Sequence, residues 1–269
     1  MLTHNAVIYE RDTDFDPVEV VEPSVEEPDR SQELSPSKKI DPAKLEHLSE
    51  SQREELLAVL DQFPDCFSDT PGFCDYIEHE IHVSSDFKPK ILRAYKVPEC
   101  LKPEVERQIN ELLSIGFIRP SKSKMASPLV CVLKGKDGMD GVRLTVDYSY
   151  VNKYTVGDTY PIPDIPDIVQ RMGSAKYISC FDAKGAYWQT KVRSDHQWLT
   201  GFVCEQGVFE WERTPLGMTS SGSTFVRAVQ QVLKPLKTFA DSYVHDMSVF
   251  SDEWHLHLEH VRKFFERIP

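Results

Sequence analysis

Two short segments carry the side chains that are best suited to chemistry. Asp182 ends the apolar segment KYISCFD, and His245 and Asp246 lie between the apolar arms of DSYVHDMSVFSD, a pattern typical of a short hairpin with a polar tip. Carboxylates on neighbouring strands can hold Mg²⁺, because the sheet fixes their separation and Mg²⁺ prefers oxygen ligands. Two such ions about 4 Å apart assist phosphoryl transfer to a nucleotide. The segments therefore predict a metal site, although a plain hairpin turn at His245-Asp246 and an Asp182 that only caps the next segment remain alternatives.

Other metal-binding residues give weaker patterns. Cys66, Cys74, His79 and His82 could gather around zinc, but their spacing matches no common zinc site, and EHEIHV also suits a strand. We interpret them as ordinary strand and loop residues. The six cysteines form no CxxC pair, which favours reduced thiols over a disulfide framework.

The elements that must position these side chains are a mixture of helices and hairpin strands. An amphipathic helix is predicted over about residues 52–63 after a capping box at Ser51 and Glu54, and a second helix ends at Gly116. The patterns further predict a hairpin over 128–148, a short helix around PDIVQRM, a strand ending at Asp182, a hairpin across Gln206-Gly207, and a helix before and after the 241–252 hairpin.

The last helix has an apolar stripe of five residues spaced by three and four. His255, His257 and His260 lie largely off this stripe, so we expect them on a solvated helix surface. The stripe comprises Trp254, Leu258, Val261, Phe265 and Ile268.

The net charge of −12 is concentrated at the N-terminus. Residues 1–50 carry 13 acidic and 5 basic side chains, a net charge of −8, in a segment rich in Pro, Glu and Asp that predicts a disordered tail. The rest is close to neutral, so a local basic groove for nucleic acid remains possible. No apolar run approaches the roughly 20 residues that span a bilayer, and no signal peptide is evident, which indicates a soluble, intracellular protein without a membrane partner.

The order of the motifs adds a family resemblance. VDYSYVNKYTVGDTYPIPDI, CFDAKGAYWQTKV, TGFVCEQGVFEWERTPLGM, SSGSTFVRAVQQVL and SYVHD resemble the reverse transcriptase of gypsy-type LTR retrotransposons, in the order and spacing of that family. The resemblance runs from about residue 75 to the C-terminus. Residues 1–74 resemble the connection between protease and polymerase in such polyproteins.

The resemblance implies roles for individual residues. Asp182 matches the first metal-binding aspartate, with the carbonyl of Ala183 beside it, and Tyr243, His245 and Asp246 occupy the Tyr-x-Asp-Asp box. The implied cofactor is a pair of Mg²⁺ ions, with Mn²⁺ as a substitute. The nucleotide-binding positions would be Lys134, Lys136 and Arg143 in the fingers hairpin, Tyr187 as the steric gate against a 2′-hydroxyl, and Leu216 and Gly217 in the nucleotide pocket.

The sequence also departs from the pattern. His245 replaces the first aspartate of the box, Ser149 stands where the family commonly has arginine, and Leu216 where it commonly has phenylalanine. The chain stops at Pro269, and no thumb, connection or RNase H segment follows in it.

We therefore expect an α+β fold made of right-hand polymerase fingers and palm, with an antiparallel palm sheet, helices on one face and the thumb absent. The expected divisions are a disordered acidic linker (1–45), a connecting segment (46–90) and the fingers and palm (91–269). The implied function is RNA-directed DNA polymerase acting on primer-template and deoxynucleoside triphosphates, impaired in this copy. The alternatives are a catalytically silent nucleic-acid-binding remnant and a palm-like fragment that binds nothing.

Overall fold

The computed structural model describes residues 35–133, 141–173 and 175–268, which belong to one compact unit. Its elements confirm the predicted α+β class. The α-helices are α1 (Pro36–Lys39), α2 (Glu50–Leu60), α3 (Lys102–Ser114), α4 (Ser149–Tyr154), α5 (Ile165–Met172), α6 (Ser221–Leu233) and α7 (Trp254–Arg267), with short 3₁₀ segments between them. The strands are β1 (Cys74–His79), β2 (Ile118–Pro120), β3 (Ser127–Leu133), β4 (Val142–Val146), β5 (Tyr177–Asp182), β6 (Thr190–Val192), β7 (Phe202–Cys204), β8 (Gly207–Trp211), β9 (Ala240–Tyr243) and β10 (Asp246–Ser251).

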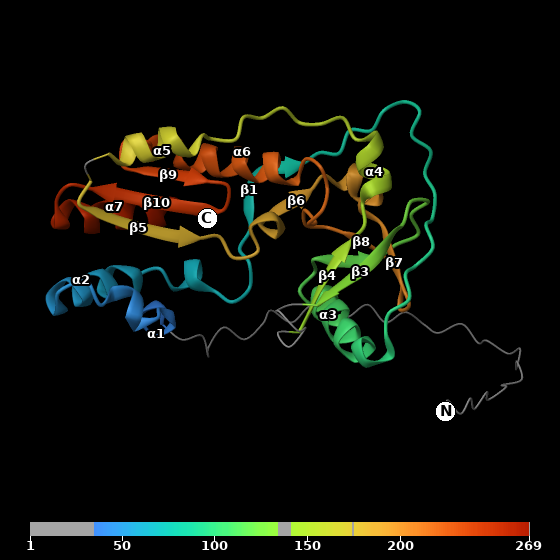
Figure 1. Ribbon diagram of the computed structural model, residues 1–269, viewed down its shortest axis with the longest axis horizontal. Helices are drawn as coiled ribbons and strands as arrows, with labels where there is room; N and C mark the ends of the chain where they lie inside the picture. The colour runs from blue at the N-terminus through green and yellow to red at the C-terminus, as the bar shows by residue number, and fades with distance from the viewer. Residues whose placement is uncertain (1–34, 134–140, 174, 269) are drawn as a thin grey trace, which may run out of the picture. The chain divides into compact units, whose positions relative to one another are not determined.

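The first sheet is antiparallel, as expected for a palm, and has the strand order β5-β10-β9; we call it the palm sheet. Alternate residues of its strands, such as Met247 and Val249, face α6 and α7 and share one apolar core with them. Figure 1 shows α7 beside this sheet, with α5 and α6 along its β9 side. One face is therefore packed by helices, which leaves the other available to a ligand.

The second sheet has five strands in the order β2-β8-β7-β3-β4 and a separate apolar core that includes α3. Val105, Ile109 and Leu112 are the buried residues of α3, as their helical spacing predicts. The β3-β4 and β7-β8 hairpins are confirmed, while the parallel pairing of β3 with β7 has no signal in the local sequence pattern. We expected the fingers in this part of the chain, and that assignment stays a prediction.

Two connections join the elements. β1 pairs in parallel with β6, so the segment before residue 80 contributes a strand next to the palm. An extended segment over residues 80–98 follows β1 (Figure 1), and we call it the strap. It pairs at Val83 with Thr155 and at Ile91 with Ala126. Phe87 of the strap packs against the rings of Tyr150, Tyr154 and Trp198.

Three details correct the sequence-based expectations. Residues 36–45, expected within a disordered linker, form α1 and a 3₁₀ turn, and Ile40 and Leu45 pack against the palm core. The capping box of α2 uses Ser49 and Gln52, because the Ser49 hydroxyl accepts from the Gln52 N–H and the Gln52 side chain accepts from the Ser49 N–H. Residues 1–34 lie outside the described residues, so the disorder expected for them stays a prediction.

The third correction concerns His257, which is buried rather than solvated. Its Nε2 lies 2.8 Å from the hydroxyl of Ser179 and its Nδ1 lies 3.1 Å from the hydroxyl of Ser251. Burial, together with the neighbouring His260, lowers the pKa of His257 to about 4. Two hydroxyl partners on the sheet thus allow an imidazole to replace an apolar side chain.

Candidate active site

Asp182 and Asp246 meet because two strands end at the same edge of the palm sheet. Asp182 is the last residue of β5 and Asp246 is the first of β10, and the antiparallel register places them directly opposite each other. Directly paired residues point to the same face of a sheet, so both carboxylates lie on one side of it. The sequence-based prediction that these two residues form one site is supported by this register.

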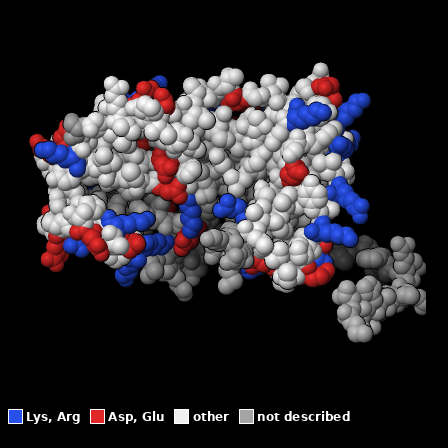
Figure 2. All heavy atoms as spheres, viewed as in Figure 1, with Lys and Arg blue, Asp and Glu red and all other residues white. Residues whose placement is uncertain are grey.

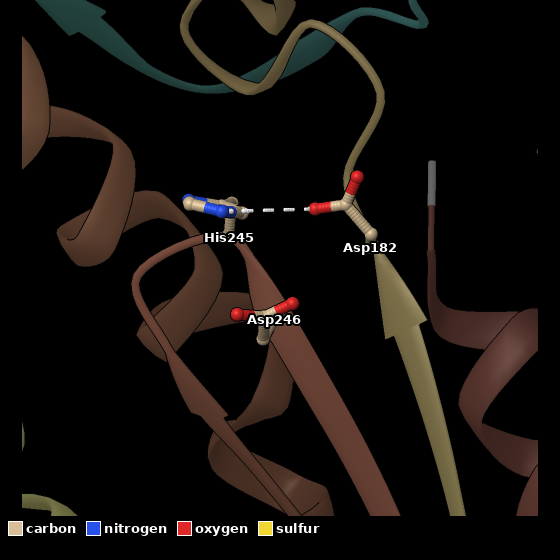
Figure 3. A group of neighbouring side chains, drawn as sticks. All are labelled: Asp182, His245 and Asp246. Atoms are coloured by element: carbon tan, nitrogen blue, oxygen red, sulfur yellow. Dashed lines mark ion pairs between the residues drawn. The ribbon is translucent and has the colours of Figure 1, made fainter.

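His245 belongs to the two-residue turn between β9 and β10. Its carbonyl accepts a hydrogen bond from the N–H of Ala183 at 3.0 Å, which ties the turn to the residue after Asp182. Figure 3 shows His245 and Asp182 directed toward each other, with Nε2 and Oδ1 3.8 Å apart, and Asp246 beside them on β10. The turn also requires a positive φ of 53° at Val244, the only non-glycine residue among those described with such an angle.

These three residues are the only group of His, Cys, Asp and Glu side chains in the described part of the chain that could hold a metal ion. One ligand atom from each lies within 4.8 Å of the others, and all three side chains are exposed. Their chemistry suits one divalent cation. It does not fit a Mg²⁺ pair, because imidazole offers a single neutral nitrogen where bridging carboxylate oxygens are needed.

The strand before the turn is held by ion pairs to one buried carboxylate. Asp241 of β9 is fully buried and contacts the guanidinium of Arg171 from α5 and, at 3.1 Å, the ammonium of Lys237. Burial raises the pKa of Asp241, but the N–H of Ser242 and the two cations outweigh burial and lower the pKa below its ordinary value. The ionised carboxylate therefore anchors β9 to α5.

Tyr187 lies in a 3₁₀ turn (Ala186–Gln189) just after Asp182. Its half-buried ring packs edge-on against Phe225 of α6, with centroids 6.0 Å apart. The preceding Lys184 donates to Asp69 at 2.8 Å, and this hydrogen bond lowers the pKa of the exposed Asp69 carboxyl. The segment before β1 thus contacts the loop that follows Asp182.

Leu216 and Gly217 lie in an exposed loop before α6. Gly217 has a φ of +92°, and a Cβ there would lie 3.2 Å from the carbonyl oxygen of Val146, so the close approach to β4 requires glycine. Asn152 of α4 donates to the Gly217 carbonyl at 2.7 Å and accepts from the Thr219 N–H at 3.0 Å. Asn152 was not among the predicted positions, although it lies within the motif VDYSYVNKY and its amide offers both a donor and an acceptor.

Some of the remaining predicted positions lie within the described residues and others do not. Arg143 is exposed on β4 opposite Val132, whereas Lys134 and Lys136 lie outside the described residues. Among the four residues considered for zinc, Cys74 and His79 are buried, and His79 contacts the hydroxyl of Thr224 at 2.8 Å. No three of these four residues bring their ligand atoms together as a metal ion would need.

Comparison with known proteins first defines the class. The fold matches the foamy viral protease-reverse transcriptase solved with an RNA/DNA hybrid, with a TM-score of 0.73 and 24% identity over 82% of this chain and 30% of that one. The chain is therefore α+β with the fold of a reverse transcriptase.

The family follows from the sequence. Residues 133–269 match the family described as reverse transcriptase (RNA-dependent DNA polymerase), and the chain belongs to this family. It is 31% identical over 193 residues to the enzymatic polyprotein of Cauliflower mosaic virus (strain NY8153), covering 71% of this chain and 28% of the polyprotein. It is also 31% identical over 216 residues to the retrovirus-related Pol polyprotein from transposon opus of Drosophila melanogaster, covering 78% of this chain and 21% of that one. The chain thus spans less than a third of each relative. No helix in the described ranges has the length and apolar character needed to cross a membrane.

Proposed function

We propose that this chain is the fingers and palm of an RNA-directed DNA polymerase from a gypsy-type LTR retrotransposon Pol polyprotein, and that His245 impairs its nucleotidyl transfer. The observation that carries the proposal is the register of Asp182 opposite Asp246 with His245 beside them. The register supplies the carboxylates, while the histidine occupies the position of a third one.

In this proposal each residue has a defined task. Asp182, the Ala183 carbonyl and Asp246 would hold a divalent ion, which when bound lowers the pKa of a primer 3′-hydroxyl and polarises a phosphate. Tyr187 would lie under the sugar of the incoming deoxynucleotide. Lys134, Lys136 and Arg143 would contact its triphosphate, and Leu216 and Gly217 would border the base.

Replacing a carboxylate with imidazole explains the impairment. The site loses one negative charge and two oxygen donors, which weakens its attraction for dications held against a triphosphate. Mg²⁺ accepts nitrogen poorly and Mn²⁺ accepts it better. We expect very low activity with Mg²⁺ and at most weak activity with Mn²⁺.

A second candidate function is nucleic-acid binding without catalysis, and the basic strap favours it. Lys88, Lys90, Arg93 and Lys96 are all exposed, and the strap pairs with the segment that carries Lys122 and Lys124. Figure 2 shows Lys and Arg side chains along the corresponding edge of the molecule. Such a row would attract a phosphate backbone, and its contribution would weaken as salt rises.

Primer extension tests the proposal. The His245→Asp change is made in a chimeric protein in which the chain is followed by the thumb of a related reverse transcriptase, so that the duplex can be held. We expect Mg²⁺-dependent extension to rise by orders of magnitude, and adding Asp246→Asn should abolish it. Mg²⁺-dependent extension by the His245 form that disappears in His245→Asp would contradict the proposal and favour a catalytic role for the imidazole, such as protonating pyrophosphate.

Nucleic-acid binding without catalysis is tested by a separate measurement. Duplex affinity of the chain is measured against salt concentration, with and without neutral glutamine at the four strap positions. If the strap binds phosphates, the substitutions reduce the salt slope by roughly 0.9 for each phosphate that is no longer neutralised. An unchanged slope would exclude the strap as the binding surface.

A further inference from the structure

The side chains of Asp182, His245 and Asp246 have the number and spacing of a single-ion site. Their ligand atoms lie within 4.8 Å of one another, and His245 Nε2 and Asp182 Oδ1 are 3.8 Å apart. A tetrahedral ion with ligands at about 2.1 Å holds its donor atoms about 3.4 Å apart. Shifts of about 1 Å therefore bring the three donors into coordination geometry.

Nothing in the backbone has to move for this closure. The β5-β10 register fixes Asp182 and Asp246, and the hydrogen bond from the Ala183 N–H to the His245 carbonyl fixes the turn. The side chains themselves can rotate, because those of His245 and Asp182 are 52% and 67% exposed. The backbone of the three residues is thus held in place, while their side chains can rotate to approach an ion.

The types of the donors select the metal. One imidazole nitrogen and two carboxylate oxygens form a mixed set that favours borderline ions, and affinity for such a set rises from Mn²⁺ toward Co²⁺ and Zn²⁺. Three protein ligands leave one position open, as in catalytic zinc sites. Mg²⁺ prefers octahedral oxygen coordination and would gain little from the nitrogen.

We propose that Asp182, His245 and Asp246 bind one borderline transition-metal ion, Zn²⁺ or Co²⁺, with an open coordination position, in preference to Mg²⁺. The inference rests on the proposed function only in placing a metal at this edge of the palm. It does not require that the chain polymerises or binds nucleic acid.

Direct metal binding by the whole chain tests the inference. The protein is stripped of metal, and Co²⁺ is titrated while its visible absorption and the heat of binding are recorded. We expect one ion per chain, with ligand-field bands typical of nitrogen and oxygen donors, and Zn²⁺ displacing Co²⁺. Mg²⁺ should compete at least about tenfold more weakly than either ion.

Matched variants locate the site. His245→Gln should weaken Co²⁺ binding at least about tenfold, whereas His255→Gln, a change at an exposed histidine of α7, should leave it unchanged. His245→Asp should shift the preference toward Mg²⁺. Equal Co²⁺ affinity in the wild type and His245→Gln, or thiolate charge-transfer bands in the Co²⁺ spectrum, would overturn the inference.

A measurement on the wild-type chain tests the metal site even if the variants fail to fold. With ¹⁵N-labelled histidine, one equivalent of Zn²⁺ should shift the ring nitrogens of a single residue among the nine histidines. A shift in several histidines, or in none, would count against the site. Primer extension in the chimera can fail while this binding persists, and binding can fail while extension is restored, so the two proposals are separable.

Discussion

Acidification should destabilise the protein through His79, which lies at the end of β1. The imidazole is fully buried, and its Nδ1 lies 2.8 Å from the hydroxyl of Thr224 on α6. Its Nε2 is buried without a hydrogen-bond partner, so a second ring proton would have no acceptor. Burial, followed by the charge of His196, lowers the pKa of His79 to about 4.

Proton linkage gives the sign and size of the change in the free energy of unfolding with pH. The unfolded chain binds a proton at His79 near pH 6.5, whereas the folded chain resists it until about pH 4. The stability is therefore fully present above about pH 6.5 and is lost as pH falls toward 4. At about 1.4 kcal/mol per pH unit, the loss is about 2 kcal/mol by pH 5 and about 3 kcal/mol at pH 4.

The assay is urea unfolding between pH 7 and pH 4.5. His79→Asn keeps a polar contact to Thr224 but cannot titrate, so its stability should fall less steeply with pH, by the slope of one proton. His47→Gln, at an exposed histidine, should retain the wild-type slope. The reasoning is wrong if His79→Asn and the wild type lose stability in parallel.

Three further changes test the site. Val244→Asn should raise the free energy of unfolding by about 1 kcal/mol, because asparagine tolerates the left-handed φ of the turn, and a lower urea midpoint would count against this. Asn152→Ala should lower the free energy of unfolding by about 1–2 kcal/mol, because two hydrogen bonds to the Gly217 loop are removed. Asn152→Asp should lose at least as much in the same melts, because its second carboxylate oxygen would face the Gly217 carbonyl oxygen. In the chimera that carries His245→Asp, Tyr187→Ala should allow incorporation of ribonucleotides, whereas Tyr187→Phe should not. Unchanged sugar discrimination together with a large loss of stability would show that the ring only packs against Phe225.

Local patterns in the sequence predicted most elements correctly. The apolar stripe of α7, the strand that ends at Asp182 and the hairpin around His245 follow from periodicity and turn chemistry, which depend on neighbouring residues alone. Asp182 and Asp246 were singled out for the same reason, because carboxylates at strand ends are visible without knowing which strands pair. The order of the motifs then indicated a reverse transcriptase, and the match over residues 133–269 confirms membership of the reverse transcriptase family.

Contacts between distant segments were decided only by the tertiary structure. The sequence places Asp182 and Asp246 at strand ends, but their direct opposition depends on the β5-β10 register, which a one-residue slip would destroy. His257 looked solvated because periodicity reports the face of a helix, not the hydroxyls of Ser179 and Ser251 that the sheet brings to it. Asn152 likewise acquires its role only when α4 meets the Gly217 loop. The residue types set which chemistry is available, whereas long-range packing sets which side chains meet, because many distant contacts must form together to fix it.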